Sequence, residues 1–180
     1  MTELGLLDAL VTKLARLFRD YELPAKSGLL QNVRVFAQYL PQPQAVAVST
    51  DAEEDTDIEP QGYSPEDIES NFPCVVVKID EATDREEGSL DATRINVSFL
   101  IGTYDEAADC QGYRDVLNII ETIRQELLTL PGRVLADKYR LEMPLRSYLF
   151  DEQAWPIYFG QIETVWETGR PLMPRNFERC

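Results

Sequence analysis

The sequence contains no histidine and only three cysteines among its 180 residues. Without histidine the chain lacks the commonest general base, the commonest metal ligand and every histidine-dependent catalytic triad. The cysteines, Cys74, Cys110 and Cys180, are odd in number and widely spaced, which is typical of free thiols in a reducing compartment. Three thiols also cannot fill a four-ligand zinc site. We therefore expect neither a metal nor a cofactor.

Several sequence motifs that mark enzymes are missing as well. There is no GxxxxGK[ST] phosphate loop, no GxGxxG dinucleotide motif and no GxSxG nucleophile elbow. Carboxylates are plentiful, but catalytic pairs need a pocket that raises one pKa, and the densest acids here lie in a polar segment. We therefore expect a protein that is not an enzyme.

Basic residues are scarce relative to acidic ones: 17 Lys and Arg stand against 32 Asp and Glu, a net charge of −15. This balance argues against a protein that grips nucleic acid, because phosphate binding needs clustered cations. The N-terminus has no basic segment followed by an apolar run, so we expect no signal peptide. No stretch approaches the ~20 apolar residues of a membrane span, so we expect no membrane partner.

The acidic excess is concentrated in one segment. Nine carboxylates lie between residues 51 and 69, and no Lys or Arg occurs between Arg34 and Lys78. This composition predicts a long acidic loop over residues 41–71, mobile when the protein is alone.

Hydrophobic periodicity predicts the remaining elements. We expect helices at 3–22 and 112–129, the second capped by Asp109. We expect strands at 33–39, 72–79, 91–104, 139–149 and 156–167, with a polar turn at 80–88 and with Pro144 at a sheet edge or bulge. The order predicts an α+β fold: a mostly antiparallel β-sheet with an N-terminal helix and a central helix packed on it. We expect the chain to form one domain over residues 1–168, followed by an extended C-terminal tail at 169–180.

Three groups of residues are candidates for contacts with other proteins. The first helix carries a second apolar stripe, Leu6, Leu10 and Leu17, which suits either a sheet or another subunit. Aromatic residues crowd the stretch 148–166, and such residues are favoured both in cores and at interface centres. The candidates are Leu6, Leu10, Leu17, Tyr148, Phe150 and Trp155, together with the tail cations Arg170, Arg175 and Arg179.

Four strings give the sequence a family resemblance. They are VRVFAQYLPQP, FPCVVVKI, VSFLIGTYDEAADCQGYRDVLNIIETIRQELL and YRLEMPLRSYLFDEQAWPIYFGQIETVWETGRP. In this order, from about residue 32 to residue 171, they resemble the tail-terminator (tail-completion) proteins of long-tailed bacteriophages and prophages. The most specific parts are the segment 101–106, the segment 111–117 and the stretch from Leu145 to Trp166 with its Phe-Asp-Glu-Gln turn.

The resemblance implies a small α+β virion protein without enzymatic activity. Six copies would form a ring at the head-proximal end of the tail tube, stop the polymerisation of the tube protein and present a surface to the head-completion or stopper protein. The protein would work at the head–tail junction after assembly in the host cytoplasm, and genomic DNA would pass through the lumen of the ring at ejection.

An acidic lumen suits such a conduit, because like charges repel DNA phosphates. We expect part of the acidic loop to face the lumen or the head side; its residues are Asp51, Glu53, Glu54, Asp55, Asp57 and Glu59. In a cyclic ring one face of each subunit fits a different face of the next. The first helix and the arginine-bearing tail are the expected contacts.

Two alternatives stay open. The chain could be a head-completion, stopper or tail-tube protein of the same phages. From another class, it could be a cytosolic acidic binding module, such as a DNA mimic that occupies a basic partner.

Overall fold

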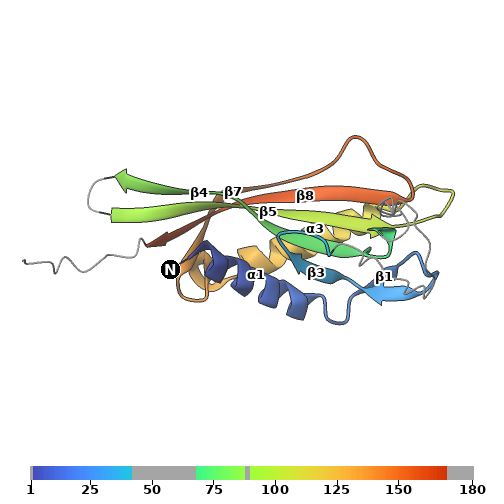
Figure 1. Cartoon of the computed structure of the whole chain (residues 1–180), viewed down its shortest axis with the longest axis horizontal. Coiled ribbons are helices and arrows are strands. Elements are labelled where there is room, and N and C mark those ends of the chain that lie inside the picture. Colours follow the sequence, from blue (N-terminus) through green and yellow to red (C-terminus); the bar gives the residue numbers. More distant parts are fainter. Residues whose placement is uncertain (1, 42–67, 88–89, 170–180) are drawn as a thin grey trace, which may run out of the picture.

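The protein is an α+β fold in which two helices cover one face of a six-stranded sheet (Figure 1). The computed structural model describes residues 2–41, 68–87 and 90–169. The sheet has the strand order β3-β4-β5-β8-β7-β6, and β1 and β2 form a separate small hairpin. The elements are α1 Glu3–Leu17, β1 Glu22–Pro24, β2 Leu30–Asn32, β3 Arg34–Ala37, β4 Cys74–Glu87, β5 Leu90–Tyr104, α3 Tyr113–Leu128, the 3₁₀ turn Pro131–Arg133, β6 Val134–Leu135, β7 Tyr139–Leu149 and β8 Ile157–Gly169.

The three long central strands, β4, β5 and β8, are antiparallel, and the edge strand β3 pairs in parallel with β4. Their side chains alternate between the two faces, as the period of a strand requires. Val77, Phe99 and Ile162 stand in register across the sheet and are buried against the helices. The sequence prediction of a mostly antiparallel α+β fold with an N-terminal and a central helix is confirmed.

Helix α1 is anchored to the sheet at its first turn. The Thr2 hydroxyl caps the helix by accepting a hydrogen bond from the Gly5 amide at 3.2 Å. The Tyr139 hydroxyl of β7 donates to the Thr2 carbonyl at 3.0 Å. A Cβ at position 5 would lie 2.6 Å from the Tyr139 hydroxyl oxygen, so any larger residue there would displace the end of the Tyr139 side chain.

The first helix is shorter than the predicted range of 3–22. It ends at Leu17, and the chain turns into β1 at Glu22. Phe18 continues the apolar stripe but is wholly buried beyond the helix end, with its ring edge-on to Tyr21 at 5.7 Å between centroids. The apolar spacing therefore continues beyond the last residue of the helix, which is why the predicted range was too long.

Helix α3 occupies Tyr113–Leu128, as its apolar stripe predicted, but Asp109 does not cap it. The N-cap residue is Gly112. Asp109 lies one turn earlier, where Cys110 adopts φ 53°, and its carboxylate accepts from the Gln111 amide at 3.3 Å. The predicted cap is therefore wrong by three residues, because an Asx-type turn precedes the helix.

The β4–β5 hairpin is longer than the sequence predicted. Residues 80–88 were expected to form a turn, but β4 continues to Glu87 past a bulge between Ile79 and Glu81. Polar pairs bridge this extension: Thr93 donates to Asp84 at 2.7 Å, and Asn96 donates to Glu81 at 3.3 Å. The extension runs beyond the N-terminal end of α1 (Figure 1) and needs no apolar face, which is why its polar sequence looked like a turn.

Pro144 lies at a bulge in β7, where the register with β8 shifts between Glu142 and Arg146. On its other side β7 pairs with β6 only at Tyr139 and Arg140. The predicted edge or bulge position of this proline is confirmed, and it suits a residue that has no amide hydrogen to donate.

A buried hydrogen-bond relay lies within the core under the helices. Trp166 is wholly buried, and its indole Nε1 donates to Thr164 Oγ1 at 2.9 Å. The Thr164 hydroxyl in turn donates to the Val97 carbonyl of β5 at 3.0 Å. Both side chains are thereby satisfied in a place that water does not reach.

We predict that Thr164→Val lowers the free energy of unfolding by about 1–3 kcal/mol, because the Trp166 indole would be left without an acceptor. Urea unfolding followed by circular dichroism measures this. The control is Thr83→Val, at an exposed strand position, for which we expect a change within about 0.5 kcal/mol. Equal unfolding midpoints for the two variants would contradict the relay.

Candidate functional site

The face of the sheet opposite the helices carries an apolar groove at one end. The groove has a volume of 360 Å³ and lies where β4 and β8 begin and β5 ends. Its walls are mostly apolar side chains, from Tyr39, Leu40, Phe72, Leu100, Phe150 and Phe159. We call this the sheet groove.

Aromatic packing shapes the floor of the sheet groove. Phe72 and Phe159 meet edge to face with ring centroids 5.7 Å apart. The Phe72 ring occupies the space next to Gly102 that a Cβ would need, so a larger residue at position 102 would displace it. Phe72, Cys74 and Tyr104 form a small buried cluster separate from the main core.

Two glutamine side chains fix the rims of the sheet groove. Gln38, in the left-handed region at φ 65°, accepts from the Ile79 amide at 3.0 Å and donates to the Ile79 carbonyl at 3.1 Å. Gln153 accepts from the Phe159 amide at 2.6 Å and donates to the Phe159 carbonyl at 3.2 Å. Gln38 thus satisfies the backbone of Ile79 after β3 has ended, and Gln153 satisfies the Phe159 amide, while the Phe159 carbonyl also accepts from the Phe150 amide at 3.2 Å. The segments that carry Tyr39, Leu40 and Phe150 are held in place as a result.

Burial makes the one cysteine in the groove floor unreactive. Cys74 is 2% exposed, and desolvation raises the pKa of its thiol to about 12, with Arg34 and the Gly102 backbone opposing that shift. At the other side of the same cluster, a hydrogen bond to Glu106 and burial raise the pKa of Tyr104 to about 12. Both groups stay protonated at neutral pH, so neither supplies a nucleophile or a base.

The remainder of the open face is polar and acidic. Asp80, Asn96, Ser98 and Glu163 line a second hollow of 310 Å³. The Ser98 hydroxyl donates to Asp80, and Gln161 donates to Ser98 at 3.1 Å. The Tyr148 hydroxyl donates to Glu163 at 2.9 Å; burial, this bond and the charges of Glu163 and Asp80 raise its pKa. The sheet groove therefore borders an acidic area.

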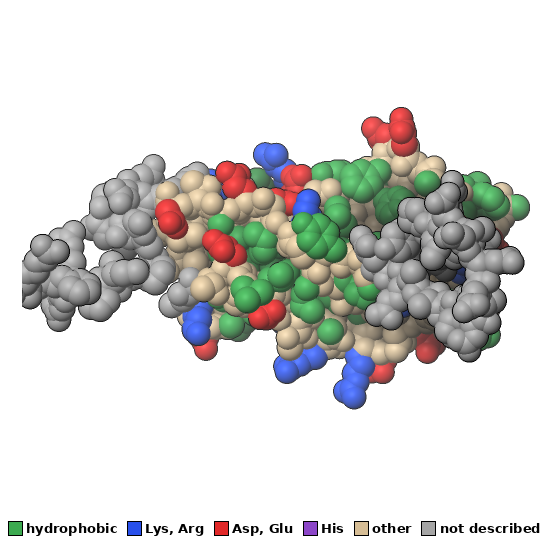
Figure 2. Space-filling model, viewed as in Figure 1, with side chains coloured by type: hydrophobic (Ala, Val, Ile, Leu, Met, Phe, Trp, Pro, Cys, Tyr) green, Lys and Arg blue, Asp and Glu red, His purple; other side chains and the backbone are tan. Residues whose placement is uncertain are grey.

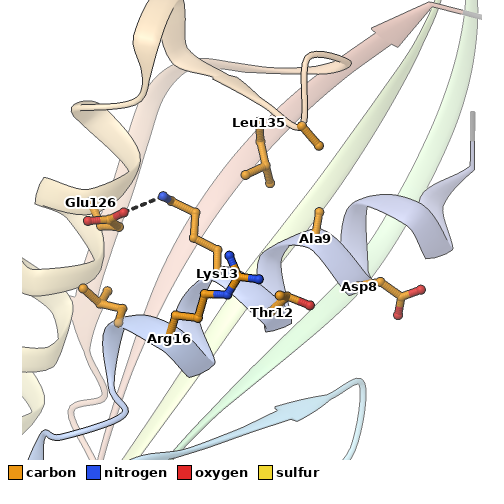
Figure 3. A pocket seen from close by; sticks show the side chains of 9 residues that line it. Asp8, Ala9, Thr12, Lys13, Arg16, Glu126 and Leu135 are labelled. Carbon is orange, nitrogen blue, oxygen red and sulfur yellow. Dashed lines mark ion pairs between the residues drawn. The ribbon is translucent and has the colours of Figure 1, made fainter.

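The helix side carries a different hollow. A groove of 690 Å³ runs beside α1, where Lys13 reaches Glu126 of α3 at 2.5 Å (Figure 3). Arg16 lines the same groove and forms no ion pair with a described residue, while Ala9 and Leu135 supply its apolar part. Figure 2 shows hydrophobic side chains exposed over the middle of one face of the molecule, with acidic and basic side chains around them.

Two of the predicted interface residues are not available for contacts. Leu6 and Leu10 are 0% exposed within a single chain, because α1 packs against the sheet and buries both side chains in the main core. Their assignment to a subunit interface is corrected accordingly: they are core residues. Leu17 is half-buried and lines the groove beside α1.

The predicted aromatic residues lie at the surface on the β7–β8 side. Trp155 is 60% exposed in the turn before β8, and Tyr148 is exposed on β7 beside the acidic area. Phe150 lines the sheet groove. The remaining candidates lie outside the described residues: the acidic residues Asp51, Glu53, Glu54, Asp55, Asp57 and Glu59, and the tail residues Arg170, Arg175 and Arg179.

Sequence analysis did not select the other groove residues, above all Tyr39, Leu40, Phe72 and Phe159. One signal was available: the run Phe72–Val77 is apolar at consecutive positions, so both faces of the start of β4 carry apolar side chains. A strand of this kind needs cover on both faces. Helices cover one of them, and the sheet groove lies on the other.

Two kinds of feature are absent from the described residues: a metal-binding cluster and a membrane-spanning helix. No group of three or more Cys, Asp or Glu side chains in those parts of the chain is placed to hold a metal ion. No helix in the same parts is long and apolar enough to cross a membrane. No model of a known protein family matches the sequence, and no curated protein is significantly similar to it.

The burial of Cys74 leads to a chemical prediction. At pH 8 a thiol with a pKa of about 12 is ionised in roughly one molecule in ten thousand. We expect N-ethylmaleimide to modify the exposed Cys110 at least about 100-fold faster than Cys74, as mass spectrometry of the native protein would measure. In 6 M urea the two rates should converge. Rapid labelling of Cys74 in the folded protein would contradict its burial.

Proposed function

We propose that this chain is a tail-terminator protein of a long-tailed bacteriophage or prophage. Copies of it, most simply six, form a ring at the head-proximal end of the tail tube, stop tube polymerisation and bind the head-completion or stopper protein. The function is structural and needs no reaction, metal or cofactor. The observation that carries the proposal is the ordered run of sequence strings from about residue 32 to residue 171.

The structural roles of residues in these strings support the proposal. In the segment 101–106, Gly102 leaves room for Phe72, and Thr103 donates to the Gly112 carbonyl before α3 at 3.3 Å. In the Phe-Asp-Glu-Gln turn, Gln153 binds the backbone of Phe159. The strings that carry the resemblance therefore contain the residues that build the sheet groove and its surroundings.

The two surfaces of the molecule suit a cyclic assembly. A closed ring with rotational symmetry uses heterologous contacts, in which two different patches of each subunit meet. The sheet groove and the groove beside α1 are two such patches, on opposite faces of the sheet and of different chemistry. A single self-complementary patch would instead favour a dimer.

The charge of the chain suits a conduit for DNA. A net charge of −15 opposes tight binding of phosphates, so genomic DNA would pass through the lumen without being held. The acidic segment around residues 51–59 is the proposed lumen or head-side surface. The protein would assemble in the host cytoplasm and then reside at the head–tail junction of the virion.

The proposal predicts a ring that caps tubes. Light scattering over a range of concentrations should give a species of about 124 kDa, six copies of a 20.6 kDa chain, with ring-shaped particles in negative stain. Added to growing tail tubes of the cognate phage that lack a terminator, the protein should bind one end and halt elongation. The control is the same mixture with another protein of similar size and net charge.

Other outcomes would favour the alternatives. Long tubes formed by the protein alone would identify a tail-tube protein. A ring that binds finished tails without stopping growing tubes would favour a head-completion or stopper protein. A monomer that does not bind tail tubes but binds a strongly basic protein, with an affinity that falls steeply as salt is added, would favour the acidic binding module.

A further inference from the structure

We infer that the sheet groove receives the C-terminal segment, residues 170–180, of a second copy of this chain. The inference rests on the proposed function, because it names the surface on which neighbouring subunits of the ring would meet. Four observations carry it: the chemistry of the groove, the chemistry of the segment, the charges around both, and the reach of the chain.

The sheet groove is a formed apolar site. It is lined mainly by aromatic and aliphatic side chains, and its rims are fixed by the backbone contacts of Gln38 and Gln153. Tyr39 at the rim is 73% exposed, which is high for a large aromatic residue beside an apolar hollow. The site is therefore shaped before a partner arrives, which lowers the entropic cost of binding.

The C-terminal segment has the composition that such a groove accepts. Its sequence is RPLMPRNFERC, with apolar side chains at Leu172, Met173 and Phe177. Pro171 and Pro174 restrict the backbone dihedrals of the segment, so fewer conformations are lost when it docks. Phenylalanine and methionine are also favoured at the centres of protein interfaces.

The charges of the two surfaces are complementary. The segment carries three arginines against one glutamate. On the open face Lys78, which lines the groove, pairs with Asp80 at 3.4 Å, so these two charges offset each other. Glu163, beside the groove, forms no ion pair with a described residue and leaves one carboxylate for an arginine of the segment. Opposite charges of this kind steer two copies toward each other and set their register.

The segment of the same copy is too short to fill the groove. Strand β8 passes the groove at Phe159 and ends ten residues later at Gly169, roughly 33 Å away along the strand (Figure 1). Phe177 is eight residues past Gly169, so even a fully extended chain brings it back by at most about 29 Å. The near part of the groove is closer: Leu100 stands in register with Gln161, about 26 Å from Gly169, so Phe177 of the same copy reaches that part. Leu172 and Met173 reach at most about 11 and 14 Å and fall short of it. The three apolar side chains of the segment can therefore enter together only the groove of another copy.

The first test measures docking directly. A fluorescently labelled peptide of residues 169–180 is added to the full chain carrying Leu172→Ser, Met173→Ser and Phe177→Ser, so that its own segment does not compete. We expect saturable binding by fluorescence anisotropy. The same peptide with Phe177→Ala should bind at least about tenfold more weakly, because a buried phenylalanine is lost.

Matched variants of the chain locate the peptide. In the same serine background, Tyr39→Ser with Leu40→Ser at the groove rim should weaken binding at least about tenfold. Leu117→Ser, at an exposed position of α3 on the other face of the sheet, should leave it unchanged. Circular dichroism checks that each variant is folded. Absence of peptide binding, or binding that the rim variant does not weaken, would overturn the inference and leave the groove to another occupant, such as residues 42–67 of the same chain.

A disulfide test separates the two possible donors of the segment. In a Cys110→Ser background, Leu40→Cys is oxidised against the native Cys180 with copper phenanthroline. We expect cross-linked dimers and higher species on a non-reducing gel, and Leu117→Cys in the same background should give none. A faster-migrating cross-linked monomer would show that the segment docks in its own chain and would overturn the second-copy assignment, as would the absence of any cross-link.

The tube-capping assay keeps the two proposals apart. If the peptide docks in the groove but the protein does not cap tubes, the docking inference stands and the terminator proposal fails. If the protein forms rings and caps tubes while the peptide shows no groove binding, the terminator proposal stands and the docking inference fails.

Discussion

Among the described residues, helices α1 and α3 cover one face of the six-stranded sheet and leave the other face open, and the rest of this structure depends on that arrangement. Successive side chains of a strand point to opposite faces, so half of the side chains of β4, β5 and β8 lack helical cover. On the helical side the sheet positions are filled by apolar residues such as Phe99, Ile162 and Trp166. On the open side, apolar residues gather at one end and polar residues over the remainder. The open face therefore offers an apolar surface at one end and a polar, acidic surface over the remainder for contacts with other molecules.

The shape of the sheet groove depends on two side chains that form hydrogen bonds with strand backbone groups at the ends of the strands. Strand β3 ends at Ala37, and the Gln38 amide side chain pairs with Ile79 in place of a further strand residue. Gln153 satisfies the Phe159 amide at the start of β8. A buried or half-buried backbone group without a partner is costly, so these contacts restrict the loops that follow. The positions of Leu40 and Phe150 at the groove thus follow from hydrogen bonds, not from apolar packing alone.

Periodicity predicted most of the fold because most elements bury one face. The alternation in β5 and β8 and the stripe on α3 each match a single covered side, and these elements form where expected. Periodicity gave wrong boundaries where a buried residue lies outside a helix, or where a strand residue is not buried. Phe18 is a core residue outside a helix, and Thr83 and Asp84 are strand residues without a core. Leu6 and Leu10 looked like an interface because a wide apolar stripe does not tell which surface covers it.

The groove itself was harder to predict, since its walls come from segments far apart in the sequence. Leu40 and Phe72 are separated by more than 30 residues, and Phe159 comes from the other end of the domain. The spacing of apolar residues within one segment does not indicate which distant segment will pack beside it. The unbroken apolar run at the start of β4 showed only that something must cover its second face. Which residues do so depends on the parallel pairing of β3 with β4, a non-local contact.

Electrostatics limit how copies of so acidic a chain can associate. Each copy carries −15, so the bodies of neighbouring subunits repel one another, most strongly at low ionic strength. The proposed ring would then need contacts that are apolar, or that bring cations to the acidic surface. The helix-side groove offers Arg16, and the C-terminal segment offers three arginines beside three apolar side chains. Added salt weakens the repulsion between bodies and the attraction of the arginines alike, whereas it leaves the apolar part of the contact in place. An assembly built in this way tolerates changes in ionic strength better than one held by ion pairs alone.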